Sequence, residues 1–116
     1  MMPVELEVRL FEEIDRLLDA HEAVVPQAVL EELRRLREGG GTEGTAAAVG
    51  ADLVRERCRV VDTTTAVADD AIVELAAAGR VAYVATNDRA LGDRVLGEDV
   101  SVIALRGRNK LAITRP

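Results

Sequence analysis

Short apolar segments alternate along this chain with amphipathic helices, and this alternation restricts the fold more than any other feature. The clearest apolar segment is Val81–Ala85, and segments 22–25, 59–62 and 100–105 are read as further strands. Strands that are apolar throughout are typical of parallel sheets buried on both faces, and the helices between them supply the crossovers. The pattern therefore predicts an α/β fold, a three-layer α/β/α domain with a mostly parallel central sheet.

Helical periodicity and capping residues mark the segments between these strands. Apolar stripes and caps predict helices over residues 6–18, from Pro26 to Leu36, over 46–57 and 67–78, and from the Thr86–Asp88 cap to about Leu96. The glycines between positions 39 and 44 are expected to break the chain, and Gly79 is expected to end the fourth helix. A last strand is expected over residues 111–114.

Length and composition exclude several classes of protein. The 116 residues carry 15 basic and 21 acidic side chains, a net charge of −6, which predicts one acidic domain over residues 1–116. A single cysteine, Cys58, excludes an internal disulfide framework and a cysteine-based zinc site. The apolar runs are far shorter than the roughly 20 residues that cross a membrane. A cytoplasmic protein without a membrane segment is expected.

Aromatic side chains are almost absent, since Phe11 and Tyr83 are the only two. Domains that bind single-stranded nucleic acid by stacking usually expose several aromatic rings to the bases. A stacking platform is therefore not expected, although a catalytic nucleic-acid cleft does not require one.

Acidic residues follow the predicted strands at four places, which are Glu31-Glu32, Asp62, Asp69-Asp70 and Asp88. Projection at 100° per residue places Glu32, Asp69 and Asp88 beside the apolar stripes of their helices, so each is expected to be half-buried. Carboxyl ends of parallel strands share one edge of a sheet, where these three carboxylates could converge. Oxygen ligands alone suit Mg²⁺ or Mn²⁺. The alternative is that each acid only offsets its helix dipole, by about 0.3 to 1 kcal/mol.

Three segments in order resemble the signature segments of the PIN domain nucleases. They are Val-Val-Pro-Gln-Ala-Val-Leu-Glu-Glu-Leu (24–33), Ala-Asp-Asp-Ala-Ile-Val-Glu-Leu-Ala (68–76) and Val-Ala-Thr-Asn-Asp-Arg-Ala-Leu (84–91). The chain resembles most closely the archaeal group related to ribosome-processing nucleases and VapC-type toxins. In that family, four acids bind one or two Mg²⁺ or Mn²⁺ ions. These ions activate the water that cuts single-stranded RNA. The resemblance assigns the second, third and fourth acids to Glu32, Asp69 and Asp88, with Asp70 as the alternative to Asp69 and Thr86 and Asn87 beside Asp88.

One part of the family pattern is missing from this sequence. Family members open with a central strand that ends in an Asp-x-Asn-like motif and supplies the first acid, whereas this chain opens with a predicted helix. The chain is therefore expected to be an N-terminally truncated PIN-like domain in which two strands lack a neighbour. Its Met-Met-Pro start resembles the stretch after that motif, so Met1 could be an internal methionine. The alternative is a genuine short form that is inactive or completed by another chain.

The C-terminal segment offers the basic residues that an RNA-binding acidic protein needs. Residues 106–116 carry four basic side chains and no acid, whereas residues 1–105 carry 11 bases and 21 acids, a net −10. Arg106, Arg108 and Lys110 are the candidate RNA-binding residues, with an ordinary solvated strand as the alternative. The competing function is a non-catalytic PIN-like module that binds RNA, an antitoxin-like or other protein partner, or a second copy of itself.

Overall fold

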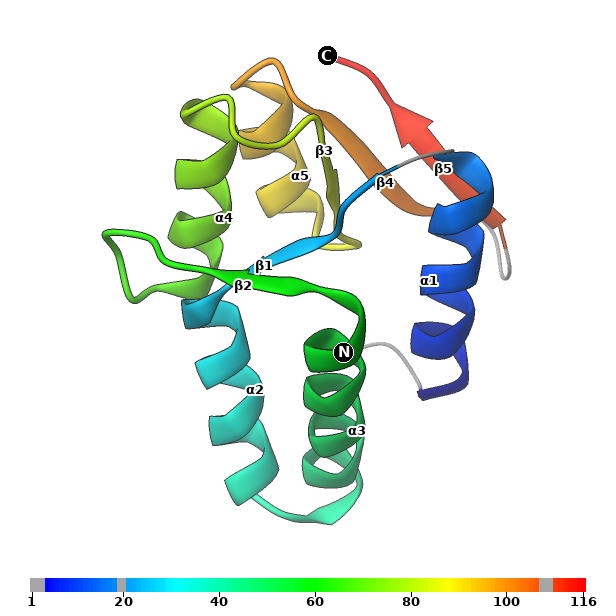
Figure 1. The fold of residues 1–116 in the computed structure, drawn as a ribbon, viewed down its shortest axis with the longest axis vertical. Helices are drawn as coiled ribbons and strands as arrows, with labels where there is room; N and C mark the ends of the chain where they lie inside the picture. The colour runs from blue at the N-terminus through cyan, green and yellow to red at the C-terminus, as the bar shows by residue number, and fades with distance from the viewer. Residues whose placement is uncertain (1–3, 19–20, 107–109) are drawn as a thin grey trace. The chain divides into compact units, whose positions relative to one another are not determined.

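The computed structural model describes residues 4–18, 21–106 and 110–116, which contain five α-helices and five β-strands (Figure 1). In chain order they are α1 Val4–Leu17, β1 Val24–Pro26, α2 Gln27–Glu38, α3 Gly41–Arg57, β2 Arg59–Val61, α4 Ala68–Ala77, β3 Tyr83–Ala85, α5 Arg89–Leu96, β4 Ser101–Arg106 and β5 Lys110–Thr114. Every predicted helix and strand is present, which confirms the α/β class. The elements divide between two compact units, Met1–Asp62 and Thr63–Pro116, which are described separately below.

In the first unit, β1 and β2 pair in parallel, with Val24 opposite Arg59 and Pro26 opposite Val61. Strand β1 leads directly into α2, because Pro26 is both the last residue of the strand and the N-cap of the helix, with φ −65° and ψ 142° in the extended region. Helix α2 packs against α3, and α1 also packs against α3. The core of this unit is aliphatic, and Leu30 is buried in it together with the small side chains of Ala28, Ala47 and Ala51.

The glycine segment ends earlier than the sequence predicted, because α3 begins at Gly41 and not at Ala46. The break lies at Gly40 and Gly41, whose φ angles of 73° and 69° favour glycine. Gly44 lies inside the helix, where a β-carbon would come 3.0 Å from the Arg37 carbonyl oxygen of α2. This glycine therefore permits close approach of the two helices and does not break the chain.

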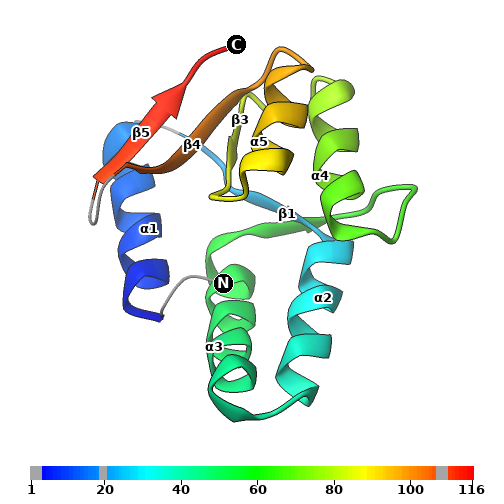
Figure 2. The same cartoon turned by 180° about the vertical axis from the view of Figure 1, so that it is seen from behind.

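In the second unit, β4 lies between two partners: β3 is parallel to it and β5 antiparallel (Figure 2). Helices α4 and α5 pack against each other, and a core forms from Ala76, Leu91, Val95, Val100 and Val102. Two of the three strand pairings in the described structure are parallel, so the strands are mostly parallel as predicted. The strands pair in two sets, one in each unit.

Backbone caps define the ends of α4 and α5. Gly79 has φ +70°, and its N–H donates to the Ala76 carbonyl oxygen. The N–H of the next residue, Arg80, donates to the Leu75 carbonyl oxygen. This pairing is a Schellman motif, so the predicted stop at Gly79 is confirmed. Asp99, with φ +61°, occupies the same position after α5. No helix in the described residues is long and apolar enough to cross a membrane.

Candidate functional site

Hydrogen bonds from the residues before and after Asp88 fix the turn that carries it. The Asp88 Oδ1 atom accepts a hydrogen bond of 3.0 Å from the Leu91 N–H and so caps α5, as the sequence predicted. The Thr86 Oγ1 atom accepts from the Asp88 N–H at 3.1 Å. Asn87 reaches across to β4, where its Oδ1 atom accepts from the Leu105 N–H at 2.8 Å. These contacts leave the Asp88 Oδ2 atom without a hydrogen bond to any described residue.

The two aspartates in the first turn of α4 have different surroundings. Asp70 accepts a hydrogen bond of 2.8 Å from Arg94 Nη2 of α5, and both side chains are 48% exposed. Asp69 is exposed and forms neither an ion pair nor a side-chain hydrogen bond within the described part of the chain. The structure therefore gives Asp70 a role in joining α4 to α5 and leaves the Asp69 carboxylate available.

Glu32 lies on α2 in the first unit and is paired locally. Its Oε2 atom accepts a hydrogen bond of 2.6 Å from Arg35 Nη2, one turn further along the helix. That hydrogen bond and the charge of Glu32 raise the pKa of the Arg35 guanidinium. A metal ion at Glu32 would have to compete with this arginine.

The expectation that Glu32, Asp69 and Asp88 are half-buried is wrong, since all three side chains are exposed. The apolar stripes beside them are narrower than a helical projection suggests. Along α2, Leu30 is buried whereas Val29, Leu33 and Leu36 are only partly covered. A residue at the border of such a stripe therefore lies in solvent.

Convergence of the three acids on one ion stays a prediction. Asp69 and Asp88 belong to the second unit and Glu32 to the first. Over residues 4–18, 21–106 and 110–116, no group of three or more His, Cys, Asp or Glu side chains could hold a metal. What the structure shows at each position is an exposed carboxylate at or near the start of a helix that follows a strand in the chain.

The predicted basic residues flank the turn between β4 and β5. Arg106 is the last residue of β4, Lys110 is the first of β5, and the two are opposite each other in the antiparallel register. Both are exposed. Arg108 lies outside the described residues.

Glu74 of α4 is not among the residues that the sequence predicted for the site, but the structure gives it a distinct role. Both of its carboxylate oxygens accept from the Thr64 N–H, at 2.8 and 3.1 Å, and one also accepts from the Thr64 hydroxyl. These hydrogen bonds lower the pKa of Glu74. The contact ties the loop before α4 to the middle of that helix. No local pattern signals it, because ten residues separate the partners.

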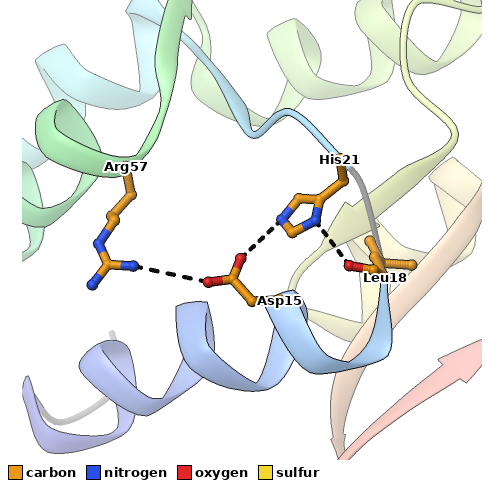
Figure 3. Close-up of polar contacts among 4 residues, drawn as sticks. All are labelled: Asp15, Leu18, His21 and Arg57. Atoms are coloured by element: carbon orange, nitrogen blue, oxygen red, sulfur yellow. Dashed lines mark hydrogen bonds and ion pairs between the residues drawn. The ribbon is translucent and has the colours of Figure 1, made fainter.

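His21 takes part in a structural cluster of the first unit (Figure 3). Its Nδ1 atom lies 3.0 Å from the Leu18 carbonyl oxygen and its Nε2 atom 3.2 Å from Asp15 Oδ1. Arg57 of α3 approaches the other Asp15 oxygen at 4.0 Å. The cluster joins α1 to the chain before β1 and to α3.

We expect the stabilising effect of Glu74 to disappear in acid. Because its folded pKa is lowered, the stabilisation is complete above the ordinary glutamate pKa of about 4.3 and is lost as the pH falls through the lower folded value. Urea unfolding of the unaltered chain and of Glu74→Gln between pH 7 and pH 3 measures this. The stability difference should be largest at pH 7 and shrink below about pH 4.3. Glu98→Gln is the control, since that exposed acid has no side-chain partner among the described residues. A Glu74→Gln difference that stays constant down to pH 3 would contradict the prediction.

Comparison with known proteins places this geometry in a family. The family model described as "PIN like domain" matches residues 1–108. Among solved structures, the chain is similar to one titled "Structure of the PIN domain endonuclease Utp24", with a TM-score of 0.75 and 25% identity. That match covers 97% of this chain and 83% of the other. No curated protein matches the chain significantly. With almost its whole length matched by the family model, the chain belongs to the PIN-like domain family.

Proposed function

We propose that this protein is a metal-dependent endoribonuclease that hydrolyses phosphodiester bonds in single-stranded RNA. Glu32, Asp69 and Asp88 are its proposed metal-binding and catalytic acids. Family membership supports this proposal, as does the similarity to a structure described as an endonuclease. The observation that carries it is the contrast within α4, where Asp70 is bound by Arg94 while Asp69 is exposed and unpaired in the described structure.

The available ligands fit Mg²⁺ or Mn²⁺ better than a softer metal. Burial raises the pKa of the Cys58 thiol, which keeps it protonated and unsuited to binding a metal. His21 is engaged by Asp15 and by the Leu18 carbonyl oxygen. The remaining donors are carboxylate oxygens, which hard divalent cations prefer. When bound, such an ion activates water and stabilises the charge on the attacking and leaving oxygens.

The residues around Asp88 would hold its carboxylate in position for this role. The α5 cap fixes Oδ1, while the hydrogen bonds of Thr86 and Asn87 restrict the preceding turn. Asp88 Oδ2 then has a defined direction without a competing partner among the described residues. We assign Thr86 and Asn87 to positioning and not to catalysis.

An acidic protein must also overcome its repulsion of a polyanionic substrate. The net charge of −6 opposes RNA binding, so basic side chains have to contact the phosphates. We propose that Arg106, Arg108 and Lys110 serve this purpose.

The second candidate function is a non-catalytic module that binds RNA, an antitoxin-like peptide or a second copy of the chain. The ion pair between Glu32 and Arg35 favours this second function, because the ion pair occupies one of the proposed metal-binding carboxylates.

Cleavage of an end-labelled single-stranded RNA separates the two candidates. The chain is incubated with Mn²⁺, with Mg²⁺ or with EDTA, and the products are resolved on a denaturing gel. The proposal expects internal cleavage with either metal and none with EDTA. Binding of the RNA without cleavage under any of these conditions would support the non-catalytic module.

A further inference from the structure

Two cations stand side by side at the end of the β4–β5 pairing. In the antiparallel register Arg106 is directly opposite Lys110, and both are exposed. Side chains directly opposite on neighbouring strands have β-carbons about 5 Å apart, and like charges in this position are destabilising. Neither residue has a carboxylate partner in the part of the chain that the structure describes. An anion between them would relieve this repulsion.

The surrounding charge distribution isolates this pair from acidic side chains. Within the second unit, residues 63–99 carry three bases and seven acids, a net −4, whereas residues 100–116 carry four bases and no acid. Arg94, by contrast, is neutralised by Asp70 at 2.8 Å. The positive charge of this unit is therefore concentrated in its last two strands and in the residues next to them.

A hydrogen bond links the cation pair to the turn that carries Asp88. Asn87 Oδ1 accepts from the N–H of Leu105, the residue immediately before Arg106, at 2.8 Å. The Thr86 N–H also donates to the Ile103 carbonyl oxygen of β4 at 3.0 Å. Both contacts lie within the second unit, so the end of β4 and the Asp88 turn form one connected structure.

We infer that Arg106 and Lys110 form a phosphate-binding site for single-stranded RNA, kept beside the Asp88 turn by Asn87. This inference rests on the proposed function and identifies where the substrate strand is held. An arginine offers a planar fork for two phosphate oxygens and a lysine a point charge, so adjacent phosphates of one strand suit the pair. Because Phe11 and Tyr83 are the only aromatic residues, binding has to depend on phosphate contacts and not on base stacking.

The test measures RNA binding separately from cleavage. Fluorescence anisotropy of a labelled single-stranded RNA, titrated with the full chain in EDTA at several salt concentrations, gives the Kd and its salt dependence. Each lost phosphate contact lowers the salt slope by about 0.7 for single strands. Arg106→Ala/Lys110→Ala should therefore lower the slope by about 1.4 and weaken binding about 20-fold at 0.1 M salt. The control Arg55→Ala/Arg80→Ala removes two exposed arginines elsewhere and should change both values much less.

The outcomes distinguish this inference from the proposed function. If the chain binds RNA through the pair but never cleaves it, the phosphate site stands and the nuclease proposal fails. If it cleaves RNA while the Arg106→Ala/Lys110→Ala protein binds and cleaves as before, the phosphate site is wrong. Equal losses in the control pair, no RNA binding by the unaltered chain, or tighter binding of poly-glutamate than of RNA would each overturn the inference.

Discussion

We expect the Asp88→Asn protein to cleave single-stranded RNA at least about 100-fold more slowly than the unaltered chain, while keeping its stability. Loss of one metal-binding carboxylate removes several kcal/mol of transition-state stabilisation, and each 1.4 kcal/mol is about a tenfold change in rate. Asparagine caps helices about as well as aspartate, so the hydrogen bond to the Leu91 N–H survives the substitution. Initial rates in Mn²⁺ and the thermal unfolding midpoint measure the two effects.

Asp88→Ala is the matched variant that removes the cap as well. It should lose as much activity as Asp88→Asn and, in addition, about 1 kcal/mol of stability from the lost α5 cap. The two variants therefore separate the structural role of this residue from its chemical role. Retained cleavage by Asp88→Asn, or loss of activity in Asp88→Ala alone, would show that Asp88 acts only as a cap.

Local sequence signals predicted those parts of the fold that depend on neighbouring residues. The stop at Gly79 and the cap at Asp88 were predictable because a glycine after a helix and an aspartate before one act within a single turn. The start of α3 was not predictable. Gly44 is tolerated inside that helix because the α2 backbone passes close to it, and this contact between two helices has no signature in a run of glycines.

The candidate site, too, could be predicted from local sequence signals only in part. Helical projection selected Asp69 over Asp70 by assuming that one is half-buried, yet both are exposed. What distinguishes them is Arg94, which lies 24 residues beyond Asp70 and reaches it from another helix. The contact between Glu74 and Thr64 likewise joins a helix to a distant loop. Such pairings follow from how the elements pack, so they could not be predicted from the periodicity of one segment.

The contrast within α4 leads to a second expected result, because neighbouring aspartates should respond in opposite ways. Asp69→Asn should slow RNA cleavage about 100-fold with little change in stability, since its carboxylate forms no ion pair or side-chain hydrogen bond with any described residue and its proposed partner is the metal. Asp70→Asn should keep cleavage within about threefold of the original rate. It should instead lose the Arg94 ion pair, which at this exposure is worth about 0.2 to 1 kcal/mol.

Asp69→Asn and Asp70→Asn each remove one negative charge from the first turn of the same helix. The change in net charge and in helix-dipole energy is therefore the same in both, and each variant serves as the control for the other. Cleavage rates in Mn²⁺ and urea unfolding should be measured on the same preparations. A further variant, Arg94→Gln, removes the partner and should reproduce the small stability loss of Asp70→Asn without affecting cleavage. If Asp70→Asn abolishes cleavage and Asp69→Asn does not, the metal-binding acid is Asp70, and Arg94 must release it when the ion binds.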